Sequence, residues 1–235
     1  MADPPLKPGD VAQLFAAIAP RYDLMNHLMT ARLDVLWRRR ACAVLEAVTG
    51  GPVLDVGTGT ADLALTLARR RPDLCIVGVD RSPEMLALGR RKVGQRRITL
   101  VRGDALALPF ADGSCTAVMS AFALRNVGDL AQALCEMRRV VAPGGPIVCL
   151  ELSWPALPGF RGLFGAYFRR LVPLLGAWVA GDRAAYTYLP ASVRAFPSGQ
   201  HLAQAMVAAG LGQVRWQRLA LGAATIHVGR REAAL

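Results

Sequence analysis

The octapeptide VLDVGTGT at residues 53–60 decides the fold of this 235-residue chain. Its first half is mostly apolar and predicts a buried strand at residues 52–56, and Gly57 and Gly59 predict a tight turn into a helix. Free N–H groups at the start of that helix can bind a ligand. A dinucleotide site would have a third glycine three residues after Gly59, but Asp62 stands there, which argues against a pyrophosphate. Taken alone, the octapeptide fits an ordinary strand-to-helix turn as well as a binding site.

The same alternation of short apolar runs and helical stretches continues along the chain. Ser82 and Pro83 have the residue types of an N-cap and a first helical position. We expect strands at residues 75–79, 98–102, 116–121 and 146–152, and helices at residues 61–71, 83–93 and 129–141. Apolar strands separated by helices indicate an α/β fold with a parallel sheet covered on both faces.

The two ends of the chain differ from this middle part. Residues 198–209 are expected to form a helix, and alternating runs at 212–219 and 223–229 predict an antiparallel hairpin at the sheet edge. Residues 1–50 have a mostly helical pattern, and residues 155–197 form a Pro-, Gly- and aromatic-rich insertion. Because there is no internal repeat and no low-complexity linker, a single domain is the better interpretation.

Acidic residues also follow the next two strands. Asp80 ends the expected second strand, where a carboxylate can accept hydrogen bonds from both hydroxyls of a ribose, and it lies 25 residues after Asp55. Asp104 and Ala105 follow the third strand and suit the edge and the face of an adenine. Ligands of open α/β sheets bind at the carboxyl ends of the strands, so these three successive positions predict one ligand site.

Net charge and cysteine content limit the partners and the compartment. The chain has 28 Lys+Arg against 17 Asp+Glu, a formal net charge of +11, and a hydrophobic fraction of 53% that excludes a disordered chain. Only Lys7 and Lys92 are lysines, so compositional bias toward arginine explains the charge as well as selection for an anionic partner does. Five widely spaced cysteines without a C-x-x-C pair, and no visible signal peptide, predict a cytoplasmic protein.

The strand-end residues resemble those of the class I S-adenosylmethionine-dependent methyltransferases over about residues 50–230. The resemblance implies a Rossmann-like fold with a seven-stranded, mostly parallel sheet, an antiparallel C-terminal strand and helices on both faces. It implies S-adenosylmethionine as cofactor, with the two glycines along the methionine part, Asp80 on the ribose, and the Asp104–Ala105 pair at the adenine. The cofactor-binding residues that follow are Asp55, Gly57, Gly59, Thr60, Asp80, Arg81, Asp104, Ala105 and Ser120.

Four further segments resemble the ubiquinone/menaquinone biosynthesis C-methyltransferase family over nearly the whole chain. They are YDLMN at residues 22–26, FALRNV at 122–127, RVVAPGG at 139–145 and YTYLPASVRAFP at 186–197. This resemblance implies C-methylation of a prenylated quinol ring. Demethylmenaquinol is the preferred acceptor, because GTAD at residues 59–62 is closer to the menaquinone-type members, and the ubiquinone-pathway benzoquinol is a second candidate.

The chain also departs from that family. Ser, His, Asp, Gly and Lys are usual in the family where this sequence has Thr30, Asp34, Thr116, Ala123 and Ala142. Asp34 replaces an imidazole near the substrate lid, and this replacement bears on which quinol is used.

The chemistry of such a transfer requires neither a nucleophile nor a metal, because the sulfonium methyl group is already activated. The enzyme must hold a ring carbon in line with the methyl–sulfur bond, and a donor that stabilises the developing phenolate helps. The resemblance implies a catalytic role for Arg125 and Asn126, and a structural ion pair is the alternative for Arg125. Arginine is a poor base, so a water held by these two residues, or solvent directly, would take the proton.

The resemblance divides one methyltransferase domain, residues 1–235, into four parts. These are an N-terminal helical lid (1–50), a cofactor-binding core (51–153), a substrate and lid insertion (154–200), and a C-terminal helix and hairpin (201–235). The substrate and lid residues that it implies are Tyr22, Asp23, Asn26, Tyr186 and Tyr188. His27 is a further, weaker candidate for a base, and Glu151 is either a partner of the site or a simple strand-end acid.

The insertion is the part of the sequence that bears on a membrane partner. Its apolar side chains alternate with arginines at helical spacing, and it carries five arginines against one aspartate. Such a segment can lie on an anionic membrane surface or pack on the core as a lid helix. A peripheral membrane location therefore fits a prenylated substrate, while the oligomeric state, including a homodimer, is left open.

Three other functions compete with this one. A methyltransferase for another small phenolic compound would have a closed pocket instead of one open to a polyprenyl tail. A nucleic-acid methyltransferase would have stacking aromatics on a basic face around the cleft, or an added RNA-binding module, and no such module is visible. An N/D-P-P-Y/F or paired-Cys motif, common in base methyltransferases of this fold, is also missing at the fourth strand, so we expect no nucleic-acid partner. A non-catalytic interaction protein would not bind S-adenosylmethionine.

Overall fold

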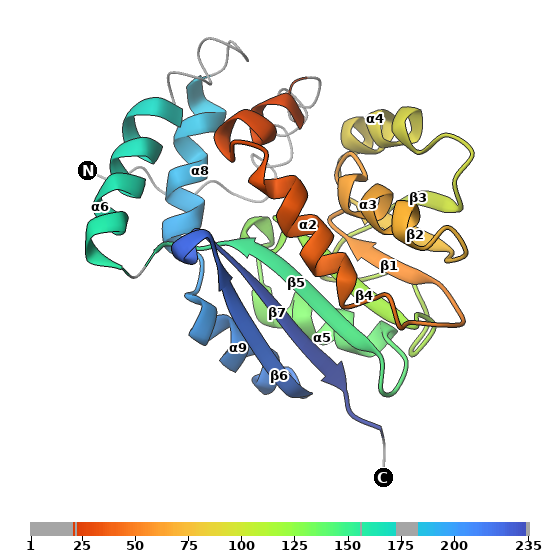
Figure 1. The fold of residues 1–235 in the computed structure, drawn as a ribbon. Coiled ribbons are helices and arrows are strands. Elements are labelled where there is room, and N and C mark those ends of the chain that lie inside the picture. The colour runs from red at the N-terminus through yellow and green to blue at the C-terminus, as the bar shows by residue number, and fades with distance from the viewer. Residues whose placement is uncertain (1–20, 22, 156, 173–182, 234–235) are drawn as a thin grey trace.

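A computed structural model describes residues 21, 23–155, 157–172 and 183–233. Its centre is one seven-stranded sheet in the order β3-β2-β1-β4-β5-β7-β6 (Figure 1). The strands are β1 (Val53–Val56), β2 (Ile76–Asp80), β3 (Ile98–Arg102), β4 (Ala117–Ala121), β5 (Pro146–Leu152), β6 (Leu211–Leu219) and β7 (Ala224–Arg231). The first five are parallel, and β7 runs antiparallel to both β5 and β6. This is the sheet that the sequence predicts.

Helices cover both faces of the sheet. They are α2 (Leu33–Ala43), α3 (Asp62–Arg70), α4 (Pro83–Val93), α5 (Leu130–Val140), α6 (Pro158–Ala166), α8 (Arg183–Ala195) and α9 (Gly199–Ala208). Buried side chains of α2 and α3 join one apolar cluster with the sheet, and those of α5 and α9 join a second cluster on the other face. Continuous burial along β1, β4 and β5 follows from this double coverage.

Local sequence signals set many of these boundaries. The Ser82 side chain accepts a hydrogen bond from the backbone N–H of Met85, which confirms the predicted N-cap of α4. The predicted terminal hairpin is also confirmed, with a short 3₁₀ turn, Ala220–Gly222, between its strands. Predicted and observed strands agree to within one or two residues.

The lid and insertion segments are described in part. Residues 23–29 form a helix before α2, which we call the N-terminal helix, whereas residues 1–20 and Tyr22 lie outside the described residues. In the insertion, a π-helical turn (Tyr167–Leu171) continues α6, and residues 173–182 lie outside the description before α8 begins. The four-part division of the chain remains a prediction. Among the described residues, no helix is both long enough and apolar enough to cross a membrane.

The topology places the functional end of the molecule. Strand order reverses between β1 and β4, so the carboxyl ends of β1, β2, β3 and β4 surround a switch point, where open sheets bind ligands. Figure 1 shows α6 and α8 beside the same end of the sheet, where β5 leads into the insertion. A ligand at the switch point would therefore lie next to the lid and insertion helices.

Candidate functional site

A first cavity, which we call the strand-end cavity, lies at the carboxyl ends of β1 to β4. Most of the predicted cofactor residues meet there, although they come from three separate segments at the ends of β1, β2 and β3. Those that line the cavity are Asp55, Gly57, Gly59, Thr60, Asp80, Arg81, Asp104 and Ala105. Asn126, predicted as catalytic, also lines this cavity.

Asp80 is held rigidly at the end of β2. One carboxylate oxygen accepts the N–H of Gly59 at 2.8 Å, and the other accepts the N–H of Ser82 at 2.9 Å. Burial raises the pKa of Asp80, while these backbone donors oppose the rise. A carboxylate oxygen can accept more than one hydrogen bond, so Asp80 retains capacity for the two hydroxyls of a ribose.

The two glycines of the octapeptide serve different purposes. Gly57 has φ +68°, and a Cβ atom there would lie 2.3 Å from the Cβ of Ala123, so the turn needs glycine to pack against the end of β4. Gly59 has φ +54°, and a Cβ atom there would meet no protein atom within 4 Å. The backbone at Gly59 therefore faces open cavity, where a ligand can approach it closely.

Asp55 is a buried carboxylate with an unused oxygen. Its Oδ2 accepts the Thr58 hydroxyl at 2.7 Å and the Ala64 N–H at 3.2 Å, whereas Oδ1 has no partner among the described residues. Burial, together with the nearby negative charge of Asp80, raises the pKa of Asp55 to about 7. A positively charged ligand fits this end of the cavity, because it would compensate the buried carboxylate.

The remaining predicted cofactor residues have varied surroundings. Arg81 and Asp104 form a loose pair at the rim, with 3.6 Å between Arg81 Nε and Asp104 Oδ2. The Thr60 hydroxyl donates to Asp23 Oδ1 at 2.6 Å, which joins the cavity wall to the N-terminal helix. Ser120 is buried and donates its hydroxyl to the Val56 carbonyl oxygen at 2.8 Å, and it is not among the residues that line the cavity.

A second cavity, which we call the aromatic cavity, lies between the N-terminal helix, α2, the insertion and the β6–β7 turn. Its wall is mainly apolar, and Phe164 and Phe168 pack with their ring centroids 4.4 Å apart. The lining residues are Asn26, Met29, Thr30, Leu33, Asp34, Trp37, Phe122, Arg125, Leu152, Phe160, Phe164, Tyr167, Phe168, Leu189, Ala220 and Ala223. A flat apolar ring with a few polar substituents fits such a wall.

Arg125 is the charged residue that the sequence singles out, and it lines the aromatic cavity instead of the strand-end cavity. Its Nη1 donates to Glu151 Oε2 at 3.0 Å and to the Phe122 carbonyl oxygen at 2.6 Å. Glu151 Oε1 accepts the Leu124 N–H at 2.7 Å. Burial raises the pKa of Glu151 and the Arg125 charge opposes the rise, so Glu151 is a fixed partner of the site as well as a strand-end acid. Arg125 Nε is buried without a partner among the described residues, and a donor of this kind suits an oxygen of a bound ring.

Phe122 stands at the junction of the two cavities, and residue type alone gave no reason to select it. It is the one described residue that lines both of them. Its φ of +59° is rare for a residue other than glycine, and such strain is retained when the surroundings fix it. Its N–H donates to Leu150 at 2.8 Å, and its ring lies 6.4 Å from that of Trp37. The two cavities therefore share the Phe122 side chain as part of their walls.

Asp34, where the sequence departs from the resembling family, is the centre of a buried polar cluster on α2. It accepts hydrogen bonds from Thr30 at 2.7 Å and from Arg38, and the His27 Nδ1 atom is 3.0 Å away. Burial alone would raise the pKa of Asp34, but the Thr30 hydroxyl and the Arg38 charge lower it below its ordinary value. His27 is thus tied to a carboxylate at the edge of the aromatic cavity.

The predicted lid residues are only partly placed. Asn26 lines the aromatic cavity, and Asp23 contacts Thr60 at the strand-end cavity. Tyr22 lies outside the described residues, and Tyr186 and Tyr188 belong to α8 at positions whose side chains are not described.

Comparisons with known proteins match one family over nearly the whole chain. Residues 5–231 match the ubiE/COQ5 methyltransferase family. A demethylmenaquinone methyltransferase of Thermus thermophilus is 46% identical over 93% of this chain and 100% of its own length, and one of Deinococcus radiodurans is 46% identical over 93% and 91%. A ubiquinone/menaquinone biosynthesis C-methyltransferase of Geotalea uraniireducens is 41% identical over 94% and 96%.

Solved structures share the fold at lower identity. The [4+2]-cyclase SpnF superposes with a TM-score of 0.69 at 18% identity, covering 100% of both chains. A SAM-dependent methyltransferase from Thermotoga maritima superposes with a TM-score of 0.66 at 19% identity, covering 94% of this chain and 99% of that one. At these identities the likeness concerns the fold alone.

Proposed function

The chain belongs to the ubiE/COQ5 methyltransferase family and is an S-adenosylmethionine-dependent C-methyltransferase of quinone biosynthesis, and we propose that demethylmenaquinol is its acceptor. Relatives that are 44–46% identical are named demethylmenaquinone methyltransferase. The observation that carries the proposal is the pair of cavities that share Phe122, because methyl transfer requires two bound molecules in contact.

The strand-end cavity would hold S-adenosylmethionine, whose sulfonium supplies a methyl group that needs no further activation. Asp80 would accept the ribose hydroxyls, and the Asp104–Ala105 pair would contact the adenine. Gly57 and Gly59 would lie along the methionine part, and the open space beside Gly59 supports this placement. The unpartnered Asp55 oxygen supports a cationic ligand, since this cofactor carries positive charge on sulfur and on its amino group.

The aromatic cavity would hold the quinol ring, with its prenyl tail along the insertion helices. Arg125 would direct a guanidinium N–H to the ring hydroxyl, which stabilises the phenolate that makes the ring carbon nucleophilic. Glu151 fixes the position of that guanidinium. Arginine stays protonated, so the hydroxyl proton would leave to water held near Arg125 and Asn126, or to solvent. The ring carbon would then form its bond to the methyl group as the methyl–sulfur bond breaks, which leaves S-adenosylhomocysteine. Loss of the proton from that ring carbon and return of one proton to the ring oxygen would restore the aromatic quinol, so one proton is released overall.

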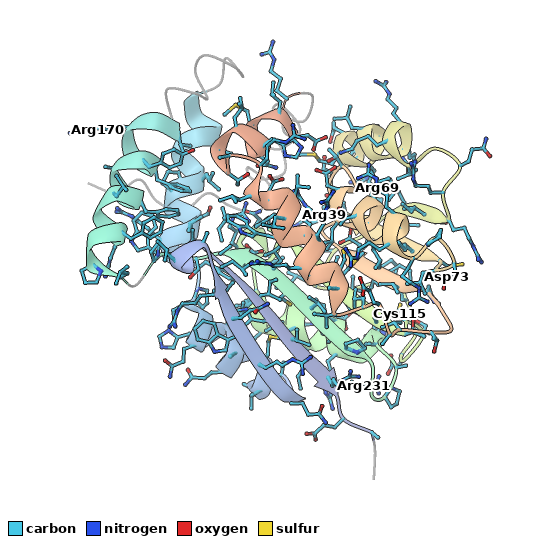
Figure 2. The ribbon with its side chains drawn as sticks, in the orientation of Figure 1. Arg39, Arg69, Asp73, Cys115, Arg170 and Arg231 are labelled. Carbon is cyan, nitrogen blue, oxygen red and sulfur yellow. The ribbon has the colours of Figure 1, made fainter. Side chains whose placement is uncertain are left out.

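A membrane surface is the proposed source of this substrate. Leu157 and Leu163, at the start and within α6, are 56% and 68% exposed. Arg161 on α6 is exposed, and Arg170 projects outward from the turn that continues α6 (Figure 2). Apolar and arginine side chains on one exposed helix suit an anionic headgroup layer, which would place the enzyme at the membrane surface.

Binding to vesicles tests the membrane part of the proposal. Leu163→Glu should reduce sedimentation with phosphatidylglycerol-containing vesicles, because it puts a like charge at the anionic surface. Val207→Glu is the matched control, since Val207 is 58% exposed and belongs to α9, which lies apart from α6 in Figure 1. Equal sedimentation of both variants and the unchanged protein would contradict this part.

Transfer of a labelled methyl group to demethylmenaquinol in detergent tests the activity. We expect a labelled menaquinol, with transfer lost in Arg125→Ala and retained in Arg40→Ala, an exposed arginine of α2. Full activity of Arg125→Ala would remove its proposed role. Transfer to small phenols but to no prenylated quinol would favour a phenolic natural product as the acceptor.

A further inference from the structure

One lysine gathers three oxygens from two separate parts of the chain. The Lys92 ammonium nitrogen lies 2.7 Å from Asp23 Oδ2 and 3.0 Å from Thr60 Oγ1, and it also bonds Asp62 Oδ1. Asp23 belongs to the N-terminal helix, whereas Thr60 lies in the turn between β1 and α3, Asp62 is the first residue of α3, and both line the strand-end cavity. Lys92 itself stands in the last turn of α4 and does not line either cavity.

The directions of the hydrogen bonds are mutually consistent. The single hydroxyl hydrogen of Thr60 goes to Asp23 Oδ1 at 2.6 Å, so Thr60 can only accept a hydrogen bond from Lys92. An ammonium group has three N–H donors, and each finds one oxygen here. The side chains of Lys92, Asp23 and Asp62 are 30%, 33% and 23% exposed, so water screens this network less than it screens an ordinary surface pair.

The identity of this cation stands out against the rest of the sequence. Of 28 basic residues, 26 are arginine, and the only other lysine is Lys7, which lies outside the described residues. An ammonium is a compact point charge whose donors diverge from one atom, whereas a guanidinium spreads its donors over a rigid plane. Three oxygens that converge on one point therefore require lysine.

We propose that Lys92 is a positioning residue that fastens the N-terminal helix to the β1–α3 turn and thereby raises the affinity for S-adenosylmethionine. Lys92 acts through Thr60 and Asp62, which form the cavity wall, and through Asp23, which brings the helix to that wall. The inference rests on the assignment of the strand-end cavity to this cofactor. It predicts that cofactor affinity depends on a side chain that does not touch the cofactor.

Cofactor affinity is the first test. In Lys92→Met, calorimetry should give a dissociation constant for S-adenosylmethionine about tenfold higher, as expected for the loss of charge-assisted hydrogen bonds. Lys92→Arg should behave like Lys92→Met although it keeps the charge. The control is Arg91→Met, because Arg91 is an exposed cation on the same turn of α4. The affinity of this variant for S-adenosylmethionine should be unchanged.

A double-mutant cycle with Asp23→Asn separates this role from general stability. If the two residues act through one network, the double variant should bind the cofactor no more weakly than Lys92→Met alone. Hydrogen exchange provides a readout without cofactor, since Lys92→Met should speed exchange of amides in residues 23–29 and leave those of α5 unchanged.

The outcomes are distinguishable. Unchanged affinity in Lys92→Met, additive effects in the cycle, or full affinity in Lys92→Arg would each overturn the inference while leaving the cofactor assignment intact. Faster exchange of residues 23–29 with unchanged affinity would also overturn it, because the network would then hold the helix without affecting the cofactor. Failure of the unchanged protein to bind S-adenosylmethionine would overturn both the inference and the cofactor assignment.

Discussion

The strand-end cavity and the aromatic cavity are built in opposite ways. The first consists of turns that each follow a strand, with carboxylates and glycines held by backbone hydrogen bonds. The second brings together the N-terminal helix, α2, the insertion and the β6–β7 turn, and its wall is mainly aromatic and aliphatic. The difference teaches that a site built from strand-end turns and a site built between helices can share one boundary, which here is Phe122.

Two residues that are neighbours in the sequence lie on opposite sides of this boundary between the cavities. Arg125 lines the aromatic cavity and Asn126 lines the strand-end cavity, because the 3₁₀ turn Leu124–Asn126 turns them to different sides. Glu151 and the strained backbone of Phe122 hold that turn in place. Substitutions should therefore fall into those that affect the cofactor, those that affect the acceptor, and those at the boundary that affect both.

The largest effect should come from Asp80→Ala, which removes the carboxylate expected to hold the ribose. We expect cofactor affinity to fall by about a thousandfold, as for the loss of two hydrogen bonds to a charged group. Calorimetry with S-adenosylhomocysteine measures this change. Asp112→Ala is the control, because Asp112 is 73% exposed and pairs only with Arg139. A small loss of cofactor affinity in Asp80→Ala would show that this carboxylate does not hold a ligand in the strand-end cavity.

Glu151→Ala should have the next largest effect, on stability. It leaves the Arg125 guanidinium buried without its carboxylate and the Leu124 N–H unpaired, and breaking a buried pair costs about 3–5 kcal/mol. Urea unfolding measures the change. Glu136→Ala is a matched control, because Glu136 also accepts a backbone N–H and pairs with an arginine, Arg139, but near the surface. Equal losses in the free energy of unfolding would show that burial of the Arg125–Glu151 pair does not set the cost of removing the carboxylate.

Phe122→Leu should impair both halves of the site by about tenfold each, as expected when part of a well-packed aromatic contact is lost. Both the cofactor dissociation constant and the KM for the quinol should rise. Phe164→Leu, which lines only the aromatic cavity, should raise the quinol KM alone. If Phe122→Leu changed only one of the two constants, the shared boundary would be contradicted.

The Asp55 carboxyl should make the stability of the protein depend on pH. Its folded-state pKa of about 7 lies above its ordinary value of 3.8, so between these values the folded protein binds more protons than the unfolded chain. The stability that this group contributes is complete below about pH 4 and falls by about 1.4 kcal/mol per pH unit as pH rises toward 7. Unfolding measured between pH 5 and 7 should show a flatter dependence in Asp55→Asn than in the unchanged protein. Parallel curves would show that Asp55 is not buried as described.

The sequence predicted the fold and the strand-end cavity because their signals are local. Asp80 and Gly59 stand at the ends of strands that hydrophobic periodicity identifies. In open α/β sheets, ligands bind at the carboxyl ends of such strands. The apolar and aromatic residues of the insertion indicate an apolar site, but they do not show which other segments complete it. Ala220 and Ala223 line the aromatic cavity from the hairpin turn, and alanine is not a residue type that marks a binding site. Lys92 contacts Asp23 across 69 positions, and no sequence pattern reports such a contact.

Arg125 shows the same limit at close range. The resemblance makes Arg125 a candidate catalytic residue. Which cavity its side chain lines depends on backbone angles, and residue type does not specify these angles. Phe122, with its positive φ, was not selected at all, because phenylalanine in an apolar run ordinarily indicates core.

The most direct test is a crystal structure of the enzyme with S-adenosylhomocysteine and a short-tailed menaquinone. We expect the thioether sulfur in the strand-end cavity and the quinone ring in the aromatic cavity. We further expect that the methyl-accepting ring carbon faces the sulfur beside Phe122, and that a ring oxygen lies within hydrogen-bond distance of Arg125. A quinone ring bound outside the aromatic cavity, or separated from the sulfur by the Phe122 side chain, would contradict these expectations.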